Sequence, residues 1–321
     1  MPVCLTALMS ILKEIKSTLL HFFKRFCHSP LLIGYCVIGT IATYILFNYW
    51  GLLTEAVNLL VLIAFAVLIR MMTSKRPAAK LPIHRPKIEL IVGILFSVLL
   101  VFVIFLIYNL TSIPGLQPLT TSIKNNIETF VNSLGEYGLP AWLTDKLYNA
   151  IICLLIQILP TSLLFIFFGY KIREIGLRSN YWLLTAILLG CCILMGPICN
   201  QTILLYQQPL FMTLLLFPVD FLINGFPEEL FIRGFLLPRF ETIFKNPINA
   251  LVITSLIFNS LHIPSAIANG DSASYAILNA LTIYFPSGLL WGYLYQRTRS
   301  VLPGALFHTS FLVLGAYFFR F

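Results

Sequence analysis

Charged residues are few in this sequence. Only 10% of its 321 residues are Asp, Glu, Lys or Arg, whereas 59% are hydrophobic. An average soluble domain has about 25% charged and about 45–50% apolar residues. The mean hydropathy of +0.90 and several apolar runs of about 20 residues, enough for a helix to cross a bilayer, therefore exclude a water-soluble protein. The runs are continuous rather than alternating, which also excludes a membrane β-barrel.

Several motifs that would indicate other functions are missing. The seven cysteines show no C-x-x-C spacing, and most lie in apolar runs, so we predict neither a disulfide framework nor a thiolate metal site. The H-E-x-x-H pattern of zinc proteases is absent. No internal repeat is visible, which argues against a secondary transporter, because those folds often contain related halves.

The apolar runs predict an all-α fold, a polytopic transmembrane helical bundle of about eight to nine spans with an N-terminal amphipathic helix. The runs lie near 31–50, 53–72, 88–110, 148–169, 181–205, 209–238, 247–267, 274–296 and 301–319. We expect the first two to form a tight hairpin and 209–238 to be tilted or to extend past the interface, because it is long for one crossing.

Three parts of the chain are predicted. Residues 1–30 contain a basic amphipathic helix that either lies on an anionic membrane face or docks on the protein. Residues 31–169 hold N-terminal transmembrane helices with no ionisable group at depth, and a 111–147 extracytoplasmic loop resembling a lid. Residues 170–321 form the core that carries the chemistry described below.

The net charge of +9 fits a membrane topology better than nucleic-acid binding. Lys and Arg cluster in alternate connections, at 1–30, 73–87, 170–180, 239–246 and 297–300. The opposite connections hold only Lys124, Lys146 and Arg320. Cytoplasmic loops carry such an excess of positive charge. We therefore predict a multi-pass integral protein of the cell (inner) membrane with a cytoplasmic N-terminus, whose partners include the bilayer but no nucleic acid.

A few ionisable residues remain at depth in the predicted spans, on several different helices. They are Asp220, Glu228, Glu229, Arg233, His262 and His308. An Asp or Arg at the centre of a membrane helix costs roughly 2.5–3.5 kcal/mol, so such residues indicate a functional site. We interpret Asp220 as structural and the others as a shared polar site.

Helix geometry predicts different roles for the two adjacent glutamates. Glu229 and Arg233 are four residues apart, with the acid N-terminal to the cation, so we predict an ion pair between them. Glu228 has no such partner, because position 232 is isoleucine. Adjacent helical residues point about 100° apart, so the two carboxylates should not face the same spot. Glu228 is thus the candidate general acid or base.

The histidines supply the rest of the site. Phe258 and His262 share a helix face, so Phe258 is expected to wall the site that His262 enters. Two histidines and a glutamate could hold zinc. Alternatively, without a metal, Glu228 and His262 polarise a water molecule and His308 stabilises the oxyanion. These residues alone leave both readings open; we favour no metal and no other cofactor.

Three motifs in order resemble a known family. They are E-E-x-x-x-R (Glu228, Glu229, Arg233), F-x-x-x-H (Phe258, His262) and a late His308. Together with "EIGLR" at 174–178 and "SGLLWGYLYQRTRSVLPGALFH" at 287–308, they resemble the CAAX protease and bacteriocin-processing family of intramembrane proteases, relatives of the type II CAAX prenyl endopeptidase. The resemblance covers about residues 170–312.

The resemblance implies a helical bundle around a water-filled catalytic chamber, and a role for each matching residue. Glu228 matches the catalytic glutamate, with Glu229 and Arg233 as its supporting pair. His262 matches the water-activating histidine, and His308 matches the histidine of the oxyanion site. All five are therefore candidate catalytic residues.

One position departs from the family pattern. The residue four places after the last histidine is usually Asn, whereas this chain has Leu312, which donates no hydrogen bond. Losing one oxyanion donor costs about 2.7–4 kcal/mol of transition-state stabilisation. We therefore expect weak or absent activity, or a replacement donor from Asn259, placed with Phe258 in the site wall, or from Ser310.

The expected function is that of an intramembrane endopeptidase, glutamic or metal-dependent, acting on a membrane-embedded or lipidated protein or peptide. A non-catalytic membrane scaffold or regulator of a partner protein is the alternative, and Leu312 is its main support. A proton-coupled transporter would use the same buried acids, but the missing repeat argues against it.

Overall fold

The computed structural model describes residues 2–74, 81–109, 141–178, 181–199, 217–282 and 285–313, with isolated positions between 122 and 133. In these ranges every regular element is a helix, so the predicted all-α class is confirmed. The predicted 111–147 loop lies mostly outside the described residues, and its last part, from Ala141, is already helical. Nothing in the structure tests the predicted division at 169/170.

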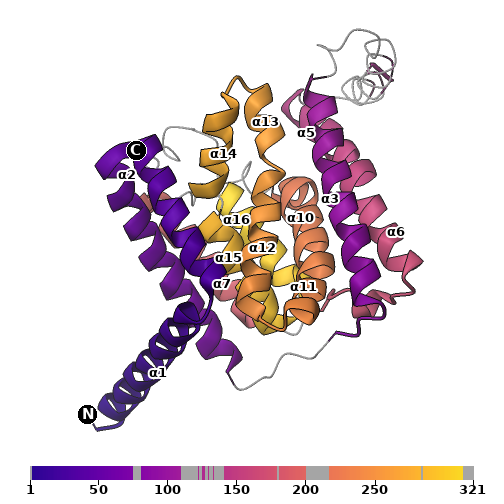
Figure 1. Ribbon diagram of the computed structural model, residues 1–321. Coiled ribbons are helices and arrows are strands. Elements are labelled where there is room, and N and C mark those ends of the chain that lie inside the picture. The colour runs from indigo at the N-terminus through magenta and orange to yellow at the C-terminus, as the bar shows by residue number, and fades with distance from the viewer. Residues whose placement is uncertain are drawn as a thin grey trace.

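The N-terminal elements surround the others in Figure 1. They are α1 (Pro2–Cys27), α2 (Pro30–Thr73), α3 (Pro86–Asn109), α5 (Ala141–Cys153), η2 (Leu154–Ile158), α6 (Leu159–Phe167), η3 (Ile172–Glu174) and α7 (Trp182–Cys199). The predicted hairpin of the first two spans is present within α2, because the helix breaks at Asn48, whose φ of 58° lies in the left-handed region.

The remaining elements form the centre of the bundle. They are η4 (Phe221–Gly225), α10 (Phe226–Glu229), η5 (Leu230–Leu236), α11 (Leu237–Phe244), α12 (Pro247–Ser260), α13 (Ile263–Ala268), α14 (Ala273–Thr282), α15 (Phe285–Thr298) and α16 (Val301–Val313). Three aromatic pairs pack α2, α3 and α6 against this centre: Phe65–Phe307 at 5.2 Å, Phe96–Phe231 at 4.8 Å and Phe165–Phe235 at 5.2 Å between ring centroids.

Several helices are suited to a membrane. Among the described residues, 5 are long and apolar enough to cross one, or up to 6 if the bent pair α14–α15 forms one span. They are Pro30–Asn48, Gly51–Thr73, Pro86–Leu106, Lys146–Phe167 and Pro247–Ala268. Two further apolar helices, Trp182–Leu194 and Val301–Val313, are shorter. Large apolar side chains such as Leu60 and Leu95 are exposed on the outside of the bundle. The chain is an integral membrane protein.

The turns that carry positive charge lie at one end of the bundle. In Figure 1, α1, η3 and the turn between α11 and α12 lie at the lower end, and the turn between α13 and α14 lies at the upper end. This arrangement is the one that the alternation of charge predicted. Which end faces the cytoplasm stays a prediction.

Candidate functional site

Two prolines shape the helix that carries the glutamates. Pro227 and Pro238 have no N–H group, so the carbonyl oxygens four residues earlier lose their helical donors. Wide π-helical turns, η4 and η5, precede these prolines. The free oxygens find other donors: Cys153 Sγ lies 2.9 Å from the Ile223 oxygen, and Arg239 Nη1 donates to the Gly234 oxygen at 3.2 Å. Such turns occur frequently at functional sites.

Glu229 and Arg233 form the predicted ion pair. Arg233 Nη1 lies 2.9 Å from Glu229 Oε1, and the two side chains are 1% and 0% exposed. Arg233 Nη2 also donates to the Gly288 oxygen on α15 at 3.0 Å. The guanidinium carbon lies 4.7 Å from the ring centroid of Phe258 and 5.7 Å from that of Trp291. The cation is therefore fully engaged by α10, α12 and α15.

His308 lies between the two glutamates. Its Nε2 is 3.7 Å from Glu228 Oε2, and its Nδ1 is 3.4 Å from Glu229 Oε1. The two carboxylates therefore face different nitrogens of one imidazole ring, as expected for adjacent helical residues that point apart. Gly304 permits this approach, since a Cβ at that position would lie 3.0 Å from Glu229 Oε2.

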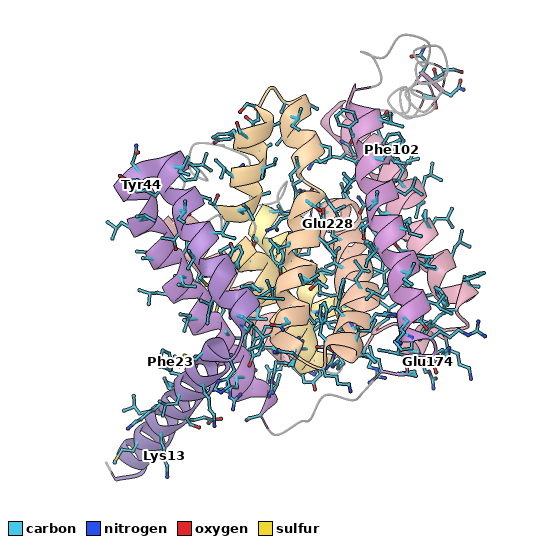
Figure 2. All side chains as sticks on the ribbon, viewed as in Figure 1. Lys13, Phe23, Tyr44, Phe102, Glu174 and Glu228 are labelled. Atoms are coloured by element: carbon cyan, nitrogen blue, oxygen red, sulfur yellow. The ribbon has the colours of Figure 1, made fainter. Side chains whose placement is uncertain are left out.

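The two carboxylates differ in accessibility. The Glu228 side chain is 12% exposed, whereas the Glu229 side chain is 0% exposed and paired with Arg233. His262 is likewise half-buried. Figure 2 shows Glu228 inside the bundle, among the central helices. Glu228 thus lies in the protein interior but keeps an accessible edge, as a group that handles a water molecule requires.

Aromatic rings join the histidines. His262 packs edge-on against Phe258, with ring centroids 5.0 Å apart, and Phe258 packs edge-on against His308 at 5.8 Å. Trp291 stacks on His308 with a centroid distance of 3.7 Å and an interplanar angle of 19°. His262 lies between the end of α12 and the start of α13. The structure thus brings Glu228, Glu229, Arg233 and His308 into direct contact, and Phe258 links His262 to them.

The two expected replacement donors are engaged elsewhere. Asn259 Nδ2 donates to the Ala280 oxygen at 2.7 Å, which holds α12 against α14. Ser310 Oγ donates to the Leu306 oxygen at 2.7 Å within its own helix. Ser310 has a single O–H and is therefore not free to replace the donor that Leu312 lacks. Asn259 uses only one of its two N–H groups in this bond, so its suggested role stays a prediction.

A second buried polar cluster escaped the sequence analysis. Glu89 on α3 is 0% exposed; it accepts from Arg239 Nε at 2.8 Å and from the Tyr170 hydroxyl at 2.7 Å. Burial is the largest cause that raises the pKa of Tyr170, to about 12. Glu89 lies in the first turn of α3, at one end of the span, so the expectation that residues 31–169 carry no ionisable group at depth stays a prediction. Glu89 follows the basic stretch that was assigned to a cytoplasmic loop, so its burial had no sequence signal.

Asp220 has the structural contact expected of it. Its Oδ1 lies 2.6 Å from Lys146 Nζ, which ties the site helix to α5. Trp291 is the site residue that sequence reasoning passed over, although the quoted stretch 287–308 contains it.

The metal-free reading stays a prediction. Within the part of the chain that the structure describes, no group of three or more His, Cys, Asp and Glu side chains is arranged to hold a metal ion.

Comparison with known protein families gives a match to the part of the chain that holds the site. Residues 210–314 match the model of the family described as "Type II CAAX prenyl endopeptidase Rce1-like". This range holds both glutamates, Arg233 and both site histidines. Neither the curated proteins nor the solved structures yield a match. The matched region, which includes the cluster around Glu228, is similar to the CAAX protease family.

Proposed function

We propose that the chain is an intramembrane endopeptidase in which Glu228 activates the attacking water. One observation carries this proposal: Glu228 has an accessible edge and lies 3.7 Å from His308, while its neighbour Glu229 is neutralised by Arg233. A carboxylate without a fixed cation is free to exchange a proton, and an ion-paired one is not. The family match supports a protease at the level of the reaction class.

In the proposed mechanism, Glu228 removes a proton from water as its oxygen attacks the peptide carbonyl carbon. The resulting oxyanion accepts a hydrogen bond from His308. Collapse of the tetrahedral intermediate breaks the C–N bond, and Glu228 passes its proton to the departing amine. His262, beside Phe258, orients and polarises the water. Glu229 and Arg233 hold the site helix against α12, α15 and α16.

The substrate is proposed to be a membrane-associated peptide. The family description names a prenyl endopeptidase, so peptides with a lipidated C-terminal cysteine followed by three residues belong in the first panel. Hydrophobic peptides without a lipid form the second panel. We further propose that the protein lies in the cell membrane with its N-terminus in the cytoplasm, as the loop charges indicate.

The test is cleavage of both panels by purified protein in lipid vesicles, read by mass spectrometry. His262→Ala is expected to lower the rate about 10²–10⁴-fold, the usual contribution of a general acid–base group. Asp220→Asn is the matched control, because it alters another buried polar side chain of the site helix and should leave cleavage near the wild-type rate. An unchanged rate in His262→Ala would remove this residue from the mechanism, and inhibition by a chelator would replace the metal-free mechanism.

The non-catalytic alternative rests on Leu312 and on the engagement of Asn259 and Ser310. It predicts that the wild-type protein cleaves neither panel. Under this alternative, Glu228→Gln would still bind a partner segment as the wild type does. Cleavage that depends on Glu228 excludes it.

A further inference from the structure

The proposed reaction requires hydrogen-bond donors around the oxyanion, and the nearby donors are already occupied. Asn259 donates to α14, Ser310 donates to its own helix, and Arg233 contacts Glu229 and the Gly288 oxygen. Leu312 has no donor to offer. Each of the first three side chains thus already donates within the protein, and apart from His308 the site needs a donor that is free to turn to the substrate.

Trp291 has a donor to offer. Its side chain is buried, with the residue 4% exposed, and its Nε1–H finds no acceptor among the described residues. The indole lies within the site, because it stacks on His308 at 3.7 Å and packs edge-on against Phe258 at 5.7 Å. Buried indole N–H groups usually find a partner, so this one calls for an explanation.

The stack also fixes the plane in which the Trp291 N–H can donate a hydrogen bond. An indole N–H points outward in the plane of its ring, and this ring lies 19° from parallel to the imidazole of His308. The donor therefore lies in a layer next to the layer of the imidazole nitrogens, one of which faces Glu228. An oxyanion that accepts from His308 would lie beside that layer.

We propose that the Nε1–H group of Trp291 donates a hydrogen bond to the carbonyl oxygen of the scissile peptide as it becomes an oxyanion, and so replaces the donor that Leu312 lacks. This proposal rests on the proposed function. It makes Trp291 a catalytic residue in addition to its role in holding the imidazole ring. A buried donor that is left without an acceptor in the free protein is satisfied when the substrate arrives.

Two substitutions separate donation from stacking. Trp291→Phe keeps an aromatic ring against His308 but has no N–H, whereas Trp291→Leu loses both. Donation predicts that Trp291→Phe lowers kcat about 10²–10³-fold with little change in KM, the usual effect of losing one oxyanion donor. Leu312→Asn in the Trp291→Phe background should recover part of that loss. If Trp291→Phe cleaves at the wild-type rate and only Trp291→Leu is slow, the residue acts by stacking alone and the proposal is overturned.

A second measurement does not depend on turnover. The indole ¹H–¹⁵N signal of Trp291, assigned by its disappearance in Trp291→Phe, is followed while a hydrophobic peptidyl phosphinate, a mimic of the tetrahedral intermediate, is added. Donation predicts a downfield shift that saturates with the phosphinate. A saturating shift in a protein that cleaves no peptide would sink the proposed function and keep Trp291 as a ligand donor, whereas no shift at saturation would overturn the donor.

Discussion

Removal of the Arg233 guanidinium tests how much the stability of the fold depends on the Arg233–Glu229 ion pair. Two unit charges 2.9 Å apart, the distance between Arg233 and Glu229, attract each other by about 6 kcal/mol at an effective dielectric constant of about 20. Desolvation offsets much of that attraction. Arg233→Met nevertheless leaves Glu229 buried at 0% exposure without its cation. Breaking a buried pair in this way costs about 3–5 kcal/mol in the free energy of unfolding.

The assay is SDS-induced unfolding in mixed micelles, followed by tryptophan fluorescence. The double variant Arg233→Met, Glu229→Met should recover most of the lost stability, because neither charge is then stranded. Lys146→Met is the matched control. It removes the cation from Asp220 at 2.6 Å, but the two side chains are 37% and 10% exposed. Water therefore reaches this pair in part, and the expected loss is smaller than for Arg233→Met.

Either of two results would contradict this expectation. If Arg233→Met is no more destabilised than Lys146→Met, groups other than Arg233 compensate the Glu229 carboxylate. Equally, a double variant as unstable as Arg233→Met alone would show that lost packing, and not a stranded carboxylate, sets the cost.

Three further predictions concern the surroundings of the site. Gly304→Ala places a Cβ 3.0 Å from the paired carboxylate, which must shift slightly to make room. Since a displacement of about 1 Å costs about 10²-fold, this smaller shift should lower kcat by clearly less than that. Gly190→Ala, which meets nothing within 4 Å, should leave kcat unchanged, and equal rates for the two would refute the steric argument. Arg239→Met strands the buried Glu89 and should lower stability by about 3–5 kcal/mol in the same unfolding assay, so unchanged stability would mean that this pair is dispensable. Leu312→Asn should raise the cleavage rate of the otherwise wild-type protein, and an unchanged rate would show that the missing amide does not limit catalysis.

The sequence predicted the parts of the site that depend on spacing along one helix. Glu229 and Arg233 pair as residues four apart should, and the cost of charge in a membrane singled out Glu228 and His308. A single-helix argument could not foresee that His308 separates the two carboxylates, because that depends on the close approach of α16 at Gly304.

Long-range packing accounts for the other differences. Asn259 was expected to serve the site, but its partner, the Ala280 oxygen, lies 21 residues further along the chain on α14. Glu89 and Arg239 are 150 residues apart, and Arg239 falls in a stretch that was predicted to be a connection, 239–246. Such pairs have no signature in hydrophobic periodicity, so only the packed helices reveal them.

The cleavage rate of Glu228→Gln tests most directly whether Glu228 activates the attacking water. This variant keeps the size of the side chain and its place beside His308 but cannot accept a proton from water. In lipid vesicles, with a peptide that the wild type cleaves, we expect Glu228→Gln to cleave at least about 10²-fold more slowly than the wild type. We also expect it to unfold at the same SDS concentration as the wild type. Cleavage at the wild-type rate by the folded variant would contradict this role of Glu228.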